Sequence, residues 1–138
     1  LDGQHVYYLA KGKTVPVIVD SNLVKPNGIV GSADGKSLFV ADIGDNKTYK
    51  YEISKGGTLI NRALFAEMGS DGMTLDNKGN LYLTGRGVTV FNSSGKQIEQ
   101  IELPGWTANV CFSGKNRDIL FITSSTAVYT LQMTVKGI

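Results

Sequence analysis

Asn27-Gly28-Ile29, followed by Leu38-Phe39-Val40, is the first of three copies of one pattern in this sequence. The other two copies are Asp71-Gly72-Met73 with Leu81-Tyr82-Leu83, and Asn109-Val110-Cys111 with Leu120-Phe121-Ile122. The polar residue precedes the apolar strand by 11, 10 and 11 positions, and the copies recur after 44 and then 38 residues. A repeat of this length, built from short strands and turns, is typical of the blades of a β-propeller.

The sequence therefore predicts an all-β propeller fold in one continuous domain. We expect a part-blade over residues 1–20, followed by blades over 27–65, 70–103 and 109–135. Glycine occurs 17 times against 3 prolines, which suits many short strands joined by tight turns. About three blades do not close a ring, so we expect a missing N-terminal half or a second copy to complete the propeller.

Each repeat divides into short strands at its turn residues. In the first repeat the expected strands are Gly28–Ser32, Leu38–Ala41, Thr48–Ile53 and Leu59–Phe65. In the second repeat we expect separate strands at Leu81–Leu83 and Val88–Phe91, because Gly85-Arg86-Gly87 between them has the composition of a turn. Two strands, Val6–Leu9 and Val15–Val19, precede the first full repeat.

Composition excludes several classes of function. The formal net charge is only +2 and the basic residues are scattered through turns, which argues against a nucleic-acid partner. No apolar run approaches the length needed to span a bilayer, so we expect no membrane partner and a location in the cytoplasm or periplasm. The only cysteine, Cys111, lies within an apolar strand and is expected to be a buried, inert thiol.

Polar residues stand at equivalent positions of the three repeats, just before the innermost strand. In a propeller the innermost strands line the central channel, so Asn27 and Asp71 would converge near its axis, with Asn109 as a third equivalent. Amide and carboxylate oxygens suit Ca²⁺ or Mg²⁺. The alternative is that these are ordinary turn residues that cap local backbone groups. Asp42 and Asp45-Asn46 form an acidic cluster without EF-hand spacing, which we interpret as solvated turn residues.

Three longer phrases carry a resemblance to a known family. Lys25-Pro26-Asn27-Gly28-Ile29, Gly69-Ser70-Asp71-Gly72-Met73 and Ala108-Asn109-Val110-Cys111-Phe112, in this order, resemble the SMP-30/gluconolactonase/luciferin-regenerating-enzyme family over essentially the whole chain. The resemblance implies a propeller of the six-bladed type, of which this chain is the C-terminal half. It also implies a channel metal, usually Ca²⁺ with Mg²⁺ or Zn²⁺ as alternatives, and hydrolysis of a small-molecule lactone.

By this resemblance Asn27 matches a metal-ligating asparagine. Asp71 matches a ligating aspartate that is also the candidate catalytic base or nucleophile. The family's N-terminal ligand glutamate and a further asparagine have no counterpart in this chain. Trp106 is a candidate for a substrate-binding loop over the channel, together with Asn109, although a packing aromatic at a blade junction is the alternative. Two hypotheses follow: part of a metal-dependent lactonase, or a non-catalytic half-propeller that serves as an interaction module.

Overall fold

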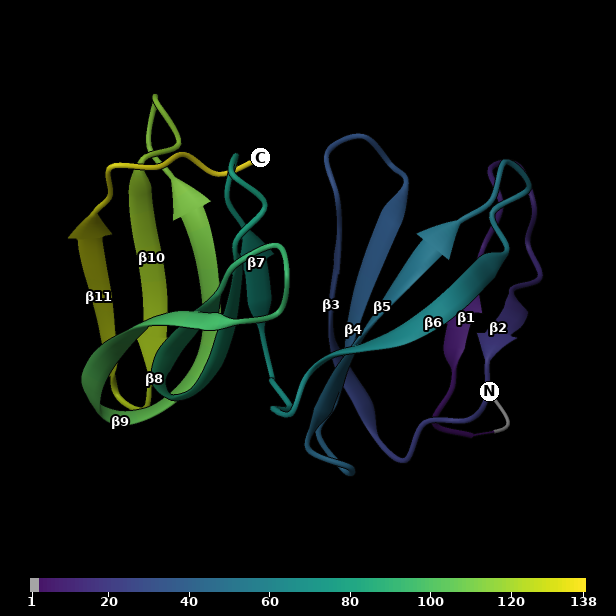
Figure 1. Ribbon diagram of the computed structural model, residues 1–138, viewed down its shortest axis with the longest axis horizontal. Helices are drawn as coiled ribbons and strands as arrows, with labels where there is room; N and C mark the ends of the chain where they lie inside the picture. Colours follow the sequence, from purple (N-terminus) through teal and green to yellow (C-terminus); the bar gives the residue numbers. More distant parts are fainter. Residues whose placement is uncertain (1–2) are drawn as a thin grey trace.

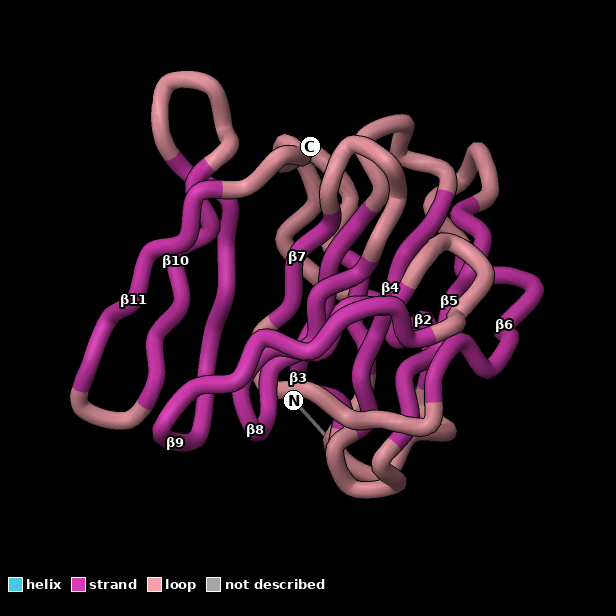
Figure 2. The backbone as a smooth tube through the Cα atoms, turned by 60° about the vertical axis from the view of Figure 1, so that its left-hand side comes forward, coloured by secondary structure: helices cyan, strands magenta, loops and turns pink. Residues whose placement is uncertain are grey.

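The computed structural model describes residues 3–138, and every regular element in this range is a strand (Figure 2). Strands that are consecutive in the sequence pair in antiparallel fashion within three sheets, which Figure 1 shows standing in succession. The first sheet contains β1 (Val6–Tyr8) and β2 (Val17–Asp20). The second contains β3 (Pro26–Gly31), β4 (Ser37–Asp42), β5 (Lys47–Ile53) and β6 (Leu59–Ala66). The third contains β7 (Met73–Leu75), β8 (Leu81–Phe91), β9 (Gln97–Ser113), β10 (Ile119–Ser124) and β11 (Ala127–Gln132).

The all-β prediction is confirmed, and the four strands expected in the first repeat occur as β3 to β6. The expected break within the second repeat is wrong. Residues 81–91 form one strand, because backbone pairing continues through Arg86, which lies opposite Trp106 on β9. The register of this pairing shifts between Arg86 and Val88, and Gly87 accommodates the shift, since its φ of 72° is in the left-handed region that favours glycine. None of the described residues forms a helix that is long and apolar enough to cross a membrane.

Three hydrophobic clusters fill the spaces between successive groups of strands. Neighbouring residues of β4 show how this arises, because Val40 belongs to one cluster while Phe39 and Ala41 belong to the next. On β8, Leu83 faces the cluster shared with β4, and Tyr82 faces the cluster shared with β10. Side chains alternate between the two faces of a strand, so β4 and β8 each contribute to the clusters on both of their faces. This alternation produces a row of layers.

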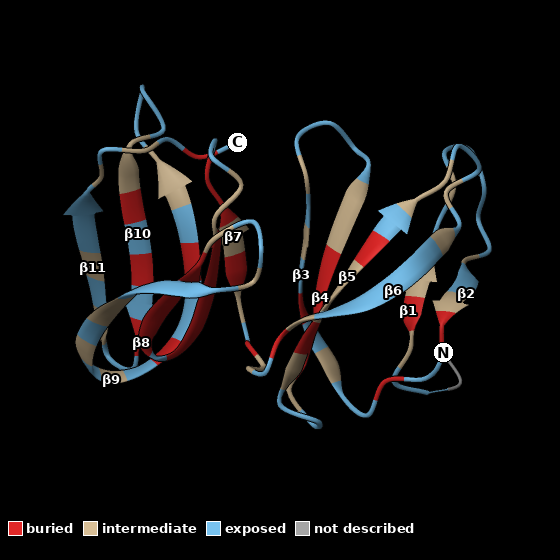
Figure 3. Ribbon diagram, viewed as in Figure 1, coloured by how far each residue is buried: buried red, intermediate tan, exposed pale blue. Residues whose placement is uncertain are grey.

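The outer face of the last strands is not covered by the rest of the chain. Cys111 and Phe121 lie opposite each other on β9 and β10, and both are exposed. Figure 3 shows the contrast between exposed β11 and the buried centre of β10. The expectation of a buried Cys111 is therefore wrong. Its strand is apolar on both faces, but within the described residues only the face bearing Val110 and Leu120 has a neighbouring layer.

Two buried tyrosines are each hydrogen-bonded to an aspartate carboxylate. Tyr51 on β5 donates a hydrogen bond to Asp20 at the end of β2 over 2.8 Å, and Arg62 forms an ion pair with the same carboxylate. Tyr82 on β8 donates to Asp76 over 3.1 Å. Burial is the main cause that raises the pKa of both phenols, and the neighbouring carboxylates raise it further.

These two tyrosines make stability sensitive to alkaline pH. We expect the free energy of unfolding to fall as the pH rises above about 10, where the unfolded chain loses phenolic protons that the folded chain retains. Urea unfolding at about pH 9 and about pH 11 measures how steeply the free energy of unfolding falls with pH. Tyr51→Phe and Tyr82→Phe should each make this slope shallower, with Tyr8→Phe at a partly exposed position as the matched control. An unchanged slope in both buried variants would contradict the prediction.

Candidate functional site

Asn27 and Asp71 come from equivalent positions of neighbouring repeats, and their side chains meet. The Asn27 Nδ2 donates a hydrogen bond to Asp71 Oδ1 over 2.8 Å, across 44 residues of sequence. Both side chains are exposed to solvent. The fold thus brings an amide and a carboxylate together at one end of the innermost strands, where both remain accessible.

Glycine at the next position of two repeats lets the neighbouring repeat approach closely. A Cβ on Gly28 would lie 2.9 Å from the carbonyl oxygen of Asp71, and the Gly28 N–H donates to the Ser70 carbonyl. A Cβ on Gly72 would collide with the side chain of Asn109. Asn109 therefore lies directly against the Asp71-Gly72 backbone, although its Oδ1 accepts a hydrogen bond from the Val110 N–H. Asn27 thus contacts Asp71, and Asn109 lies against the next residue of the chain, Gly72.

A buried hydroxyl pair holds the backbone around Asp71, and sequence reasoning did not single it out. Ser70 and Thr84 are 2% and 1% exposed, and their hydroxyls lie 3.2 Å apart. Ser70 Oγ donates to the Gly72 carbonyl over 2.6 Å, and Thr84 Oγ1 accepts from the Gly72 N–H over 3.0 Å. Ser70 precedes Asp71 in sequence, but only the tertiary structure brings Thr84 beside it.

The acidic cluster beside the site has a structural role. Asp42 is 1% exposed and accepts hydrogen bonds from the backbone N–H groups of Val24, Lys25 and Gly44, so its interpretation as a solvated turn residue is wrong. It fixes the segment that leads into Asn27. Asp45 is exposed, and a hydrogen bond from the Lys47 ammonium holds the pKa of its carboxyl below the usual value.

Asp71 and Trp106 line the same open hollow of about 330 Å³. Ile43, Asn46, Gly69, Ser70 and Thr84 complete its lining. Asn46 accepts a hydrogen bond from the Gly69 N–H, which connects the loop after β4 to the segment before Asp71. The structure thus places Trp106 in the hollow that contains Asp71, and Asn27 is hydrogen-bonded to Asp71 at its side.

Asn27 and Asp71 carry the oxygen atoms that a hard divalent cation prefers, but they are only two residues. The structure has the amide nitrogen of Asn27 facing Asp71, and a half-turn of the amide would place its oxygen beside the carboxylate as a second oxygen ligand. Among residues 3–138 there is no group of three or more histidine, cysteine, aspartate or glutamate side chains that could hold a metal ion. Ca²⁺ takes about 6 to 8 oxygen ligands, so the side chains of Asn27 and Asp71 by themselves do not make a complete calcium site.

Comparison with known proteins shows consistent similarities. The model of the family described as "SMP-30/Gluconolactonase/LRE-like region" matches residues 2–126. The lactonase drp35 of Staphylococcus saprophyticus is 32% identical over 112 residues, which cover 72% of this chain and 34% of that protein. The structure of the gluconolactonase XC5397 from Xanthomonas campestris superposes with a TM-score of 0.84 at 27% identity, covering 100% of this chain and 46% of the other.

The fold is also shared with a more distant structure. Regucalcin from Agrobacterium tumefaciens, described as a calcium-binding protein, superposes with a TM-score of 0.84 at 24% identity, covering 97% of this chain and 54% of the other. The structural neighbours are six-bladed propellers, and the chain covers about half of them. It spans between about a third and a half of the length of the curated relatives that it matches. The all-β chain therefore has the architecture of about half of a six-bladed propeller.

Proposed function

The chain belongs to the SMP-30/gluconolactonase/LRE-like family, and we propose on this basis that it supplies the metal-binding and catalytic side chains of a lactonase. The observation that carries the proposal is the Asn27–Asp71 pair, which is formed by equivalent positions of adjacent repeats. Asp71 of this pair lines a hollow that also presents Trp106. The names of the relatives, a lactonase, a gluconolactonase and a calcium-binding protein, support the same assignment.

In this proposal Asn27 Oδ1 and an oxygen of Asp71 would hold a divalent cation, with Ca²⁺ as the first candidate. When bound, the ion would polarise the lactone carbonyl and stabilise the developing oxyanion. Asp71 would orient the attacking water and accept its proton as the water oxygen bonds to the carbonyl carbon. The ring C–O bond then breaks, the leaving oxygen takes up a proton, and a hydroxy acid is released. Asn109 and Trp106 would contact the substrate beside this centre.

The proposal requires that the propeller be completed. Two protein ligands are too few for Ca²⁺, and the remaining ligands would come from the missing N-terminal half or from a second copy of the chain. The exposed apolar side chains on the outer face of β9 to β11, among them Phe121 and Val128, support this requirement. In a ring this face would lie against another blade.

The second candidate function is a non-catalytic half-propeller that acts as an interaction module. The observation that favours it is the incomplete donor set, with only Asn27 and Asp71 adjacent in the part of the chain that the structure describes. The two functions differ in whether Asp71 binds a metal ion.

Calorimetric titration with CaCl₂ distinguishes these functions when the oligomeric mass is determined on the same sample. We expect saturable binding by the chain and its loss in Asp71→Ala. Asp34→Ala is the matched control, because Asp34 lies in the turn between β3 and β4, at the opposite end of β3 from Asn27. Absence of saturable binding in every oligomeric form would exclude a second copy as the source of the remaining ligands and would favour the interaction module for the chain by itself. Binding that survives in Asp71→Ala would contradict the proposed metal site.

A further inference from the structure

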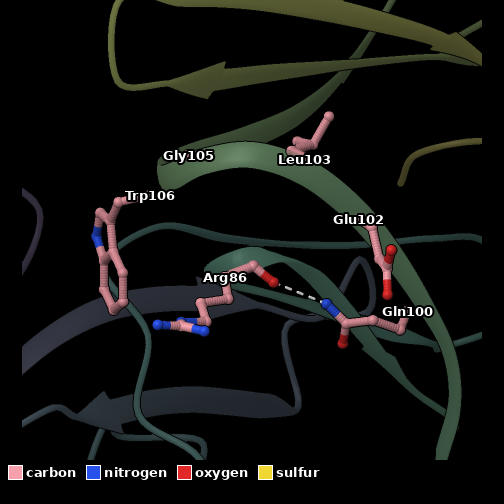
Figure 4. A pocket seen from close by; sticks show the side chains of 6 residues that line it. All are labelled: Arg86, Gln100, Glu102, Leu103, Gly105 and Trp106. Carbon is pink, nitrogen blue, oxygen red and sulfur yellow. Dashed lines mark hydrogen bonds between the residues drawn. The ribbon is translucent and has the colours of Figure 1, made fainter.

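A second pocket lies beside the hollow that contains Asp71. It has a volume of about 600 Å³ and is lined by Arg86, Gln100, Glu102, Leu103, Gly105 and Trp106 (Figure 4). Trp106 lines both the pocket and the hollow. The indole therefore borders both the space beside Asp71 and the space beside Arg86. Neither the family description nor the names of the relatives assign a role to this pocket.

The backbone beneath the two exposed side chains is held by hydrogen bonds. The Arg86 carbonyl accepts from Gln100 Nε2 over 2.8 Å, and Gln100 Oε1 accepts in turn from Thr89 Oγ1 over 2.7 Å. The Trp106 carbonyl accepts from the Ser125 N–H over 2.9 Å. Arg86 and Trp106 also lie opposite each other in the pairing of β8 with β9. The fold thus presents both side chains from a fixed position, which lowers the entropy lost when they bind a ligand.

The guanidinium of Arg86 forms no ion pair with another described residue, so it is available to bind an anionic ligand. The ion pairs among the described residues are Lys36–Asp34, Lys47–Asp45 and Arg62–Asp20, and they do not include Arg86. Figure 4 shows the Arg86 guanidinium extending toward the Trp106 ring, whereas the Glu102 carboxylate lies at the other end of the pocket beside Gln100. Trp106 is 60% exposed, which is unusual for the largest apolar side chain of the chain.

We propose that Arg86 and Trp106 form a subsite for an anionic sugar, so that the lactone carries a carboxylate or phosphate group away from its reacting carbonyl. This inference rests on the proposed lactonase function for the identity of the reacting group. A guanidinium binds either anion through two parallel N–H···O hydrogen bonds, and an indole packs against the C–H face of a sugar ring. Arg86 would then determine specificity, while Asp71 and the metal ion would act on the carbonyl.

Fluorescence titration tests the subsite without hydrolysis or metal, because Trp106 is the only tryptophan in the chain. The probes are glucose 6-phosphate, glucuronate and glucose, so that the first two distinguish phosphate from carboxylate. We expect a saturable change with at least one anionic sugar at a concentration about 10- to 100-fold lower than with glucose. Arg86→Gln should remove this preference. Arg117→Gln, at the turn between β9 and β10 far along the chain from Arg86, makes the same change of charge and should keep it.

The outcomes separate this inference from the proposed function. Asp71→Asn is expected to keep the preference for the anionic sugar even though it removes the negative charge at the proposed metal site and the proposed base. Three results would each overturn the subsite. The first is that the titration midpoints for glucose and both anionic sugars are equal, and the second is that neither anionic sugar causes a saturable change in fluorescence. The third is that Arg86→Gln keeps the original preference for the anionic sugar. Loss of lactone hydrolysis or of calcium binding bears only on the proposed function.

Discussion

Asp71→Asn is expected to lower kcat/KM for lactone hydrolysis by about 100- to 10,000-fold. The substitution keeps the size of the side chain and an oxygen that faces Asn27, but the amide cannot accept a proton from water and carries no charge to hold a divalent cation. Initial rates with glucono-δ-lactone, followed by acid release in the presence of CaCl₂ and corrected for spontaneous hydrolysis, measure this effect. The protein must be in the oligomeric form that binds calcium.

The control for this prediction is Asp34→Asn, which makes the same chemical change at the other end of β3. Asp34 Oδ1 accepts hydrogen bonds from Ser32 Oγ over 2.6 Å and from the Lys36 N–H over 3.1 Å, and an asparagine oxygen can accept both. We expect its rate to stay within a few-fold of the original. If Asp71→Asn kept more than about a tenth of the activity, general-base catalysis by this residue would be refuted.

The repeating fold was predictable because each repeat carries its own local signals. The four strands β3 to β6 alternate apolar side chains and are separated by Asp34-Gly35 and Gly56-Gly57, so pattern and turn chemistry agree. Local signals could not reveal that β8 and β9 run on through Gly85 and Gly105. That continuity depends on pairing between Arg86 and Trp106, which are 20 residues apart. Composition there indicates a turn, and tertiary pairing overrides it.

The sequence could predict only those residues of the candidate site that stand at equivalent positions of the repeats. Asn27 and Asp71 could be paired because they hold equivalent positions, and the structure places their side chains 2.8 Å apart. Their roles as metal ligands remain a prediction. Thr84, which fixes the backbone around Asp71, has no such register signal and resembles any polar strand residue in the sequence. Asp42 was misinterpreted because its backbone partners, Val24 and Lys25, lie on a distant segment.

The layered packing explains how Asn27 and Asp71 keep their relative positions. β4 and β8 each contribute alternate side chains to two different hydrophobic clusters, so adjacent repeats cannot slide past each other without disturbing both. The Asn27–Asp71 contact joins β3 to the segment before β7, and these strands also enclose the cluster that contains Met73 and Leu83. The stability of this cluster and the geometry of the candidate site are therefore coupled.

Leu83→Ala is expected to reduce the free energy of unfolding by about 3 to 5 kcal/mol. Leu83 is 0% exposed and packs in the cluster between β3–β6 and β7–β8, together with Phe39, Ala41 and Leu75. The substitution removes buried apolar surface and leaves a cavity that rigid strands on both sides cannot fill. The loss is a large share of the roughly 5 to 15 kcal/mol that stabilises a typical domain. Urea unfolding followed by circular dichroism measures it.

Leu64→Ala on β6 is the matched control, because it makes the same change at a side chain that is 50% exposed. We expect it to cost less than about 1.5 kcal/mol, since half of the surface already contacts water. Leu83→Ala should also weaken calcium binding, because the loosened cluster no longer holds Asn27 against Asp71, whereas Leu64→Ala should leave the calcium affinity unchanged. Equal destabilisation by the two variants would mean that the layer between the sheets is not closely packed, and the coupling between core and site would then have no physical basis.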